Sequence, residues 1–254
     1  MGLVVWVLYT ALTVLIQSSS GIPYAEWFST AAGAWRTGVL SLLAGSVLLL
    51  VFVGFTRWDH VWRDPFRLET TRVMKVAMVF WWLAIFIRLL GIRWTAVPLD
   101  LLLPIVISGI LVGFAEETLF RGIFLRCLRQ GGRPESTAAI WTAICFGLFH
   151  LPNVFMGMGA IGLFQVVIAA LSGVVLYLFR RQGGLIWPAM VAHGAWDIST
   201  FLSGGYAMAW LQATNLAMLA VSIGLGAAVL VSIYRHDRRT VALPAAAEQA
   251  PTGL

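Results

Sequence analysis

The chain has 254 residues, of which 60% are hydrophobic and only 11% are charged, and its mean hydropathy is +0.88. Soluble domains usually carry about a quarter charged residues, so this composition excludes a soluble globular protein and predicts a membrane protein with several spans. The formal net charge of +6 could indicate nucleic-acid binding. The basic residues, however, lie mostly between apolar stretches, where they indicate membrane topology instead.

We expect about eight transmembrane helices and an all-α fold. Most of the apolar stretches reach the roughly 17–25 residues that cross a bilayer, and the first and the fifth are the shortest. Because no basic residue precedes the first stretch, we interpret it as an uncleaved anchor rather than a signal peptide. In chain order the stretches lie at residues 3–17, 38–55, 73–90, 99–121, 136–151, 159–179, 185–202 and 210–234.

The chain divides into four predicted parts. They are N-terminal transmembrane helices at 1–98, a core at 99–202 that carries the motifs described below, a further transmembrane helix within 203–240, and a tail at 241–254. The tail is rich in Ala and Pro and is predicted to be disordered.

All but three of the 17 basic residues fall on one side of the predicted membrane. The other side receives only Arg36, Arg88 and Arg93. The positive-inside rule therefore places both termini in the cytoplasm, and we expect a multi-pass protein of the bacterial inner membrane. If residues 3–17 only lie on the interface, the amino terminus moves outside and the rest of the topology stands. Five tryptophans near span ends are expected in the headgroup layer, namely Trp58, Trp62, Trp81, Trp94 and Trp187.

Two adjacent carboxylates, Glu116 and Glu117, lie near the end of the fourth apolar stretch. A carboxylate in lipid costs roughly 2.5–3.5 kcal/mol on insertion scales, so both must face protein or a wet cavity. Glu117 and Arg121 stand four residues apart with the acid first, which favours a structural ion pair. Glu116 points about 100° away around the helix and is left to find partners on other helices. Gly109 and Gly113 predict a close helix contact.

Three further polar side chains lie inside predicted spans. His150 ends the fifth stretch, and His193 and Asp197 share one face of the seventh because four residues separate them. Counted from a turn predicted at residues 131–134, Glu116 and His150 lie at the same depth, about 25 Å along their helices. His193 can reach this level from a turn near Gly183. These groups are therefore predicted to form one site inside the bilayer, nearer the cytoplasm.

Three motifs are now in view on separate stretches, namely Glu116-Glu117-x-x-x-Arg121, Phe146-x-x-x-His150 and His193-x-x-x-Asp197. In this order they resemble the CAAX protease and bacteriocin-processing (CPBP/ABI) family of intramembrane proteases, which includes the type II CAAX prenyl endopeptidases. The resemblance covers about residues 99–202. The third motif of the family often ends in Asn, where this chain has Asp197.

The resemblance implies an endopeptidase that hydrolyses a peptide bond of a membrane-associated protein or peptide. In the mechanism it implies, Glu116 and His150 hold and deprotonate a water, and His193 together with Asp197 stabilises the oxyanion. An ionised Asp197 cannot donate a hydrogen bond, so we expect it either to orient His193 or to be protonated. Glu117 and Arg121 are expected to be structural, and Phe146 to pack beside the site.

Other interpretations stay open at this level. No cofactor is required, although Glu116, His150 and His193 could instead hold a zinc ion with an open position for water. A catalytically silent scaffold or immunity protein would keep the same fold. A proton-coupled transporter would also bury Glu, His and Asp within the membrane, but it is expected to show inverted repeats, and none is visible. The expected partners are the lipid bilayer and a membrane-associated substrate, and no nucleic acid.

Overall fold

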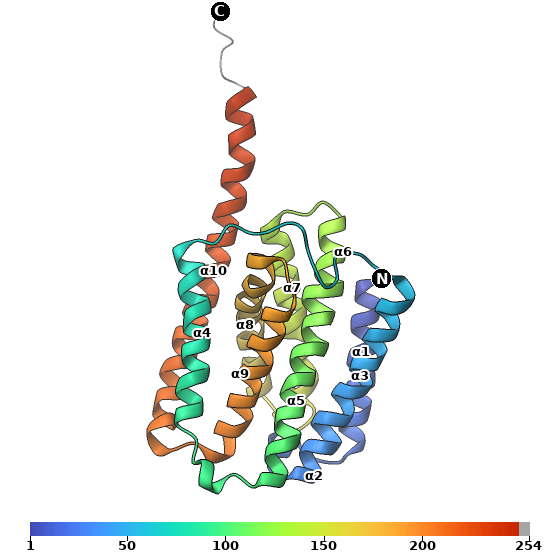
Figure 1. Cartoon of the computed structure of the whole chain (residues 1–254), viewed down its shortest axis with the longest axis vertical. Coiled ribbons are helices and arrows are strands. Elements are labelled where there is room, and N and C mark those ends of the chain that lie inside the picture. The colour runs from blue at the N-terminus through green and yellow to red at the C-terminus, as the bar shows by residue number, and fades with distance from the viewer. Residues whose placement is uncertain (249–254) are drawn as a thin grey trace, which may run out of the picture.

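The computed structural model describes the backbone of residues 1–248, which form a bundle of long helices without a β-strand (Figure 1). Seven helical stretches within the described chain are long and apolar enough to cross a membrane, which confirms an all-α polytopic membrane protein. The long helices are α1 (Gly2–Ser19), α3 (Leu40–Thr56), α4 (Arg72–Leu90), α5 (Leu99–Glu117), α7 (Glu135–Phe149), α8 (Ile161–Gly183), α9 (Trp187–Tyr206) and α10 (Ala209–Glu248).

Short elements extend or join these helices. Two π-helical segments, η2 (Ala34–Val39) and η4 (Thr118–Phe124), continue directly into α3 and from α5. The remaining short elements are η1 (Tyr24–Glu26), α2 (Ala31–Gly33), η3 (Trp94–Ala96), α6 (Leu125–Gln130) and η5 (Leu151–Val154).

Helix α9 is the eighth long helix, although it is absent from the seven apolar spans. Its polar residues, among them His193 and Asp197, lower its hydropathy, yet it packs against α5, α4 and α8 within the bundle. The count of about eight helices therefore holds, and the least apolar of them lies beside the predicted site.

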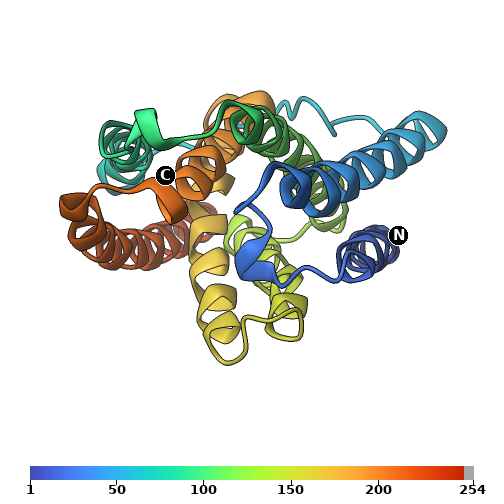
Figure 2. The same cartoon turned by 90° about the horizontal axis from the view of Figure 1, so that it is seen from below.

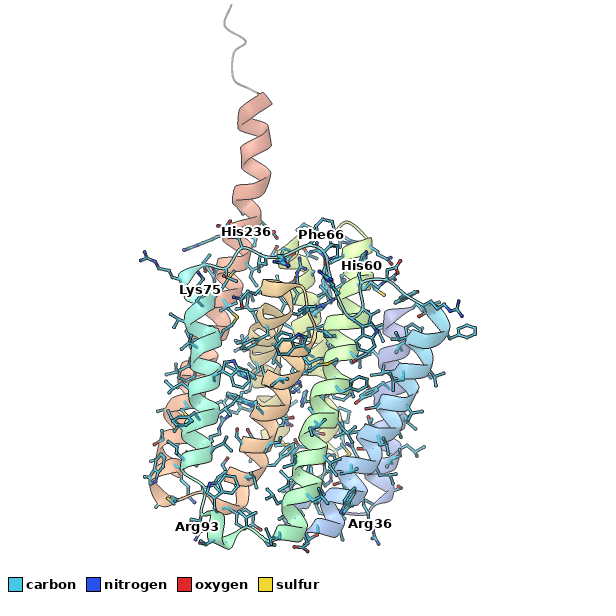
Figure 3. The ribbon with its side chains drawn as sticks, in the orientation of Figure 1. Arg36, His60, Phe66, Lys75, Arg93 and His236 are labelled. Carbon is cyan, nitrogen blue, oxygen red and sulfur yellow. The ribbon has the colours of Figure 1, made fainter. Side chains whose placement is uncertain are left out.

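The amino terminus and the last described residues of α10 lie at one end of the bundle, together with the connection 57–71 and the turn 131–134 (Figure 1). We call this the basic end; it also carries Lys75, whereas Arg36 and Arg93 lie at the far end (Figure 3). The arrangement agrees with an even number of crossings. Placing the basic end in the cytoplasm stays a prediction of the positive-inside rule.

Two predicted turns are present, and each has a glycine in the left-handed region. Gly132 has φ +66° in the turn between α6 and α7, and Gly184 has φ +74° directly after α8. Because L side chains rarely adopt these angles, glycine is the residue that closes such turns. A Cβ on Gly184 would also meet the carbonyl oxygen of Asp64.

The predicted tail differs from the structure over part of its length. Helix α10 continues through residues 241–248, where the sequence indicated disorder. Alanine has the highest intrinsic helix propensity, and three alanines lie at 245–247. The rest of the tail, residues 249–254, lies outside the described residues.

Helices α5 and α9 approach each other through glycines, as Gly109 and Gly113 predicted. A Cβ on Gly113 would lie 2.2 Å from the carbonyl oxygen of Met190, and one on Gly194 would lie 2.6 Å from that of Gly109. No real Cβ tolerates such contacts, so only glycine permits this spacing. The contact brings the helix of Glu116 and Glu117 directly against the helix of His193 and Asp197.

Candidate active site

A cavity of about 290 Å³ lies among the helices and collects the predicted polar groups. All four residues predicted to be catalytic line it: Glu116 from α5, His150 at the end of α7, and His193 and Asp197 from α9. Phe146 lines it as well. The geometry thus brings together side chains that are up to 81 positions apart in the sequence.

Glu117 and Arg121 form the predicted ion pair. Arg121 Nη1 donates to Glu117 Oε1 over 2.7 Å, and both side chains are completely buried. Arg121 Nη2 also donates to the carbonyl of Gly173 on α8, over 2.8 Å. The same Glu117 oxygen lies 2.8 Å from His193 Nδ1, a contact that the sequence did not predict. Glu117 therefore joins the arginine to the imidazole and fixes the orientation of the ring.

The other nitrogen of His193 faces two further carboxylates at longer range. Its Nε2 lies 3.9 Å from Glu116 Oε2 and 3.7 Å from Asp197 Oδ2. These separations are too long for direct hydrogen bonds, and polar groups at such distances are commonly bridged by water. Glu116 Oε2 is buried and has no hydrogen-bond partner among the described residues. Glu116 Oε2 can therefore still accept a hydrogen bond from a water or a substrate.

The His150 ring is oriented by a hydrogen bond to the backbone of its own helix. Its Nδ1 lies 2.9 Å from the carbonyl oxygen of Phe146, and a carbonyl can only accept, so Nδ1 carries the proton. In the neutral ring this leaves the lone pair on Nε2, which is the form a general base or water ligand needs. The Phe146 ring packs against both imidazoles, with centroid distances of 5.2 Å to His150 and 5.5 Å to His193, as expected for a packing residue beside the site.

The π-helix η4 begins directly after the two glutamates. π-helical turns are rare and occur frequently at functional sites. Arg121 lies within η4, and its guanidinium carbon stands 4.4 Å from the centre of the Phe146 ring. Apolar periodicity does not reveal a single widened turn, so the sequence indicated an ordinary α-helix here.

Trp81 does not lie in the headgroup layer, and that expectation was wrong. Its side chain is 3% exposed and lines the cavity. Trp81 Nε1 donates to the carbonyl of Ala192 over 2.9 Å, and its ring stacks on Trp196 with centroids 4.1 Å apart. Arg88 stands over the other ring, 3.9 Å from the Trp196 centroid. Trp81 and Arg88 thus support α9 on both sides of His193. In the sequence, the only signal for this role is that the Trp81 indole N–H needs an acceptor when it is buried.

The segment between α1 and α2 closes the cavity toward the far end. Tyr24 lines the cavity, its backbone N–H donates to the carbonyl of Met156, and its hydroxyl accepts a 2.8 Å hydrogen bond from Gln165. Gln165 in turn accepts from Asn153 over 2.9 Å. Burial raises the pKa of Tyr24 to about 12, so this hydroxyl stays neutral. Figure 2 shows the segment crossing the middle of the bundle.

The zinc alternative lacks a matching set of ligands. Within residues 1–248 no three His, Cys, Asp or Glu side chains are grouped to hold a metal ion. Both imidazole rings contact Phe146, and the nitrogen of His193 that binds Glu117 is turned away from Glu116. These residues therefore do not fit a zinc ion.

Comparison with known proteins finds a similarity in the core alone. No curated protein and no solved structure matches the chain. A family model described as type II CAAX prenyl endopeptidase Rce1-like matches residues 98–199, a range that holds all three motifs and nearly coincides with the core predicted at 99–202. Residues 98–199, about two fifths of the chain, are therefore similar to the Rce1-like type II CAAX prenyl endopeptidases.

Proposed function

We propose that the chain is an intramembrane endopeptidase that hydrolyses a peptide bond of a membrane-associated protein or peptide. The family is a protease family, and the geometry of the cavity supports the chemistry. The observation that carries the proposal is the placement of Glu116, whose buried Oε2 has no protein partner and lies 3.9 Å from His193 Nε2. Buried polar atoms without partners are rare, and a catalytic role is one of the reasons for which they are retained.

In the proposed mechanism, Glu116 and His150 hold a water molecule. Glu116 takes one proton of this water as the oxygen attacks the carbonyl carbon of the substrate, and it later passes that proton to the departing amine. The two products are a new carboxyl group and a free amine. His150, with its Nδ1 proton fixed on the Phe146 carbonyl, accepts a hydrogen bond from the water at Nε2.

His193 stabilises the oxyanion in this mechanism. Glu117 accepts a hydrogen bond from Nδ1. In this mechanism the three neighbouring carboxylates, Glu116, Glu117 and Asp197, keep the ring doubly protonated, so that Nε2 donates toward the cavity. Preorganised donors of this kind contribute a large share of catalysis in acyl transfer. Asp197, 3.7 Å from the same nitrogen, donates beside it when it is protonated. In this mechanism Glu117 orients His193, a role that the sequence analysis considered for Asp197.

The walls of the cavity fit an apolar or aromatic part of the substrate. Eight aromatic rings line the cavity besides that of Phe146 and those of the histidines: Tyr9, Tyr24, Trp27, Phe28, Trp81, Phe149, Trp196 and Phe201. Burial of such surface supplies binding free energy in proportion to the area removed from water.

The test is Glu116→Gln in native membranes. Loss of the base should reduce cleavage by about 10²–10⁴-fold, measured as new peptide termini by mass spectrometry of membranes from cells that express either chain. Glu69→Gln is the matched control, because Glu69 is exposed in the connection at the basic end, and it should cleave like the wild type. Identical profiles from the wild type and Glu116→Gln would instead favour a silent scaffold.

A further inference from the structure

A second cavity, of about 320 Å³, lies at the basic end and is lined by four arginines. We call it the arginine pocket; its charged or titratable lining residues are Arg121, Arg126, Arg129, Arg180, His60 and Asp64. His60 and Phe66, which also line it, lie at the basic end in Figure 3. The pocket contains one acid and four permanently charged arginines, so the sign of its net charge determines which kind of ligand it can bind.

Two of the four arginines are already neutralised. Arg121 pairs with Glu117, and Arg129 pairs with Glu135, its Nη1 lying 2.5 Å from Glu135 Oε2. The one acid of the pocket is also occupied, because Asp64 Oδ2 lies 2.6 Å from Arg181 Nη1 and 3.5 Å from Arg129 Nε. Asp64 therefore does not neutralise the other two arginines, Arg126 and Arg180.

Arg180 is deeply buried and contacts only uncharged oxygens. Its side chain is 1% exposed, and its two terminal nitrogens donate to the backbone carbonyls of His60, Val61, Trp62 and Gly184. Its Nε has no hydrogen-bond partner within the described chain. Carbonyl dipoles solvate a guanidinium but do not cancel its charge, and a buried charge without a counter-ion is costly.

Arg126 is the second arginine without a carboxylate. It donates from Nε to the carbonyl of Asp59 over 2.6 Å and from Nη1 to the side chain of Gln130 over 3.0 Å, and it lies over the ring of Trp58. Across the part of the chain whose side chains are described, neither Arg126 nor Arg180 forms an ion pair. The pocket thus has an excess of two positive charges.

We propose that the arginine pocket binds a phosphate group, presented by the headgroup of an anionic phospholipid. Guanidinium groups match phosphate oxygens in geometry and charge. The pocket lies at the end of a membrane bundle, where headgroups lie, and basic pockets between transmembrane helices hold such headgroups. The inner wall supplies the buried Arg180, and the half-buried Arg126 and the exposed His60 form the outer wall. This site is separate from the proposed protease chemistry and does not depend on it.

The experiment measures retained lipid on the purified full-length chain. Native mass spectrometry of protein exchanged into mixed micelles of phosphatidylglycerol and phosphatidylcholine should show one phosphatidylglycerol retained preferentially. Arg126→Gln removes one uncompensated charge without disturbing the buried Arg180, and it should weaken that retention about tenfold. Arg133→Gln is the matched control, because Arg133 is exposed at the same end but does not line the pocket. It should bind like the wild type.

A second experiment uses inorganic phosphate, and it distinguishes a lipid headgroup from a free phosphate ion as the ligand. Phosphate should raise the melting temperature of the wild type and of Arg133→Gln, but not that of Arg126→Gln. If it does so and no phosphatidylglycerol is retained, the same site binds the free ion as its ligand. The proposal is overturned when neither probe binds selectively, or when Arg126→Gln and Arg133→Gln weaken binding equally. Melting temperatures without ligand establish that both variants fold.

Discussion

Two buried ionic networks of similar composition behave differently in this molecule. The site network comprises Glu116, Glu117, Arg121, His193 and Asp197 in the middle of the bundle, and the end network comprises Asp64, Arg129, Glu135, Tyr177 and Arg181 at the basic end. In the end network, each carboxylate oxygen of Glu135 accepts two hydrogen bonds, all between 2.5 and 3.0 Å.

The difference lies in what each network leaves unused. None of the five members of the end network has a buried polar atom without a partner, within the described residues, whereas the site network has three, on Glu116, Glu117 and Arg121. A closed set of hydrogen bonds fixes structure and offers nothing to a ligand. Of these three residues only Glu116 lines the first cavity, so its unpaired oxygen is the one that the proposed function offers to water and substrate.

The largest expected effect comes from breaking the closed network. Arg181→Met leaves Asp64 without its closest ion-pair partner and Glu135 without two of its four hydrogen bonds, and it should lower the free energy of unfolding by about 3–5 kcal/mol, measured by denaturant unfolding in detergent. The cleavage rate per folded molecule should stay the same. Arg133→Met, at an exposed position, should have little effect. A variant as stable as the wild type would contradict the structural role of the end network.

The next effect comes from separating the two helices of the site network. Gly113→Ala places a methyl group where the Met190 carbonyl now lies, so α5 and α9 must move apart. A displacement of about 1 Å in an active site can cost about 10²-fold in rate, measured as cleavage per folded molecule. Gly54→Ala, whose Cβ would meet nothing within 4 Å, is the control. Full activity in folded Gly113→Ala protein would show that the glycine contact does not set the geometry.

A smaller effect is expected from the support of α9. Trp81→Phe keeps the ring and removes the hydrogen bond to the Ala192 carbonyl, which should cost about 1 kcal/mol of stability. The same change at the exposed Trp82, for which no hydrogen bond exists in the described structure, should cost less. Equal shifts in melting temperature for the two variants would remove Trp81 from the support of the site.

The smallest effect is expected at Asp197. Asp197→Asn keeps a donor beside His193 Nε2, and Glu117 continues to fix the ring, so turnover should fall less than about tenfold, which corresponds to roughly 1.4 kcal/mol. Asp197→Ala removes the donor and should reduce turnover further. If Asn abolishes cleavage as fully as Ala, the mechanism requires a charged Asp197 instead of a donor. Steady-state cleavage rates of the two variants make the distinction.

Helical spacing predicted much of this site from the sequence. Residues four apart on one helix meet, which predicted the pair of Glu117 and Arg121, and a motif placed at similar depth on three helices predicted a common cavity. The contact between Glu117 and His193 joins residues 76 positions apart. Periodicity gives the face of a helix and not the neighbour that it meets, so this contact could not be predicted.

Arg180 and Arg181 show a second limit of sequence reasoning. Because they follow an apolar stretch, the positive-inside rule counted them among the basic residues on one side of the membrane, which corresponds to the basic end. The structure places them at that end but buries both side chains at 1% exposure. Their acceptors come from the connection 57–71 and from α7, and charge counting contains no information about such partners.

The π-helix between α5 and α6 couples the orientations of the two cavities. An α-helix advances by about 100° per residue, so a widened turn changes the direction that every later side chain faces. Upstream of η4, Glu116 and Glu117 point to α9; within and beyond it, Arg121, Arg126 and Arg129 line the arginine pocket. Deleting one residue from 118–124 would rotate the arginines by about that angle relative to the glutamates. The length of this one turn therefore sets how the proposed catalytic site and the proposed phosphate site are oriented relative to each other.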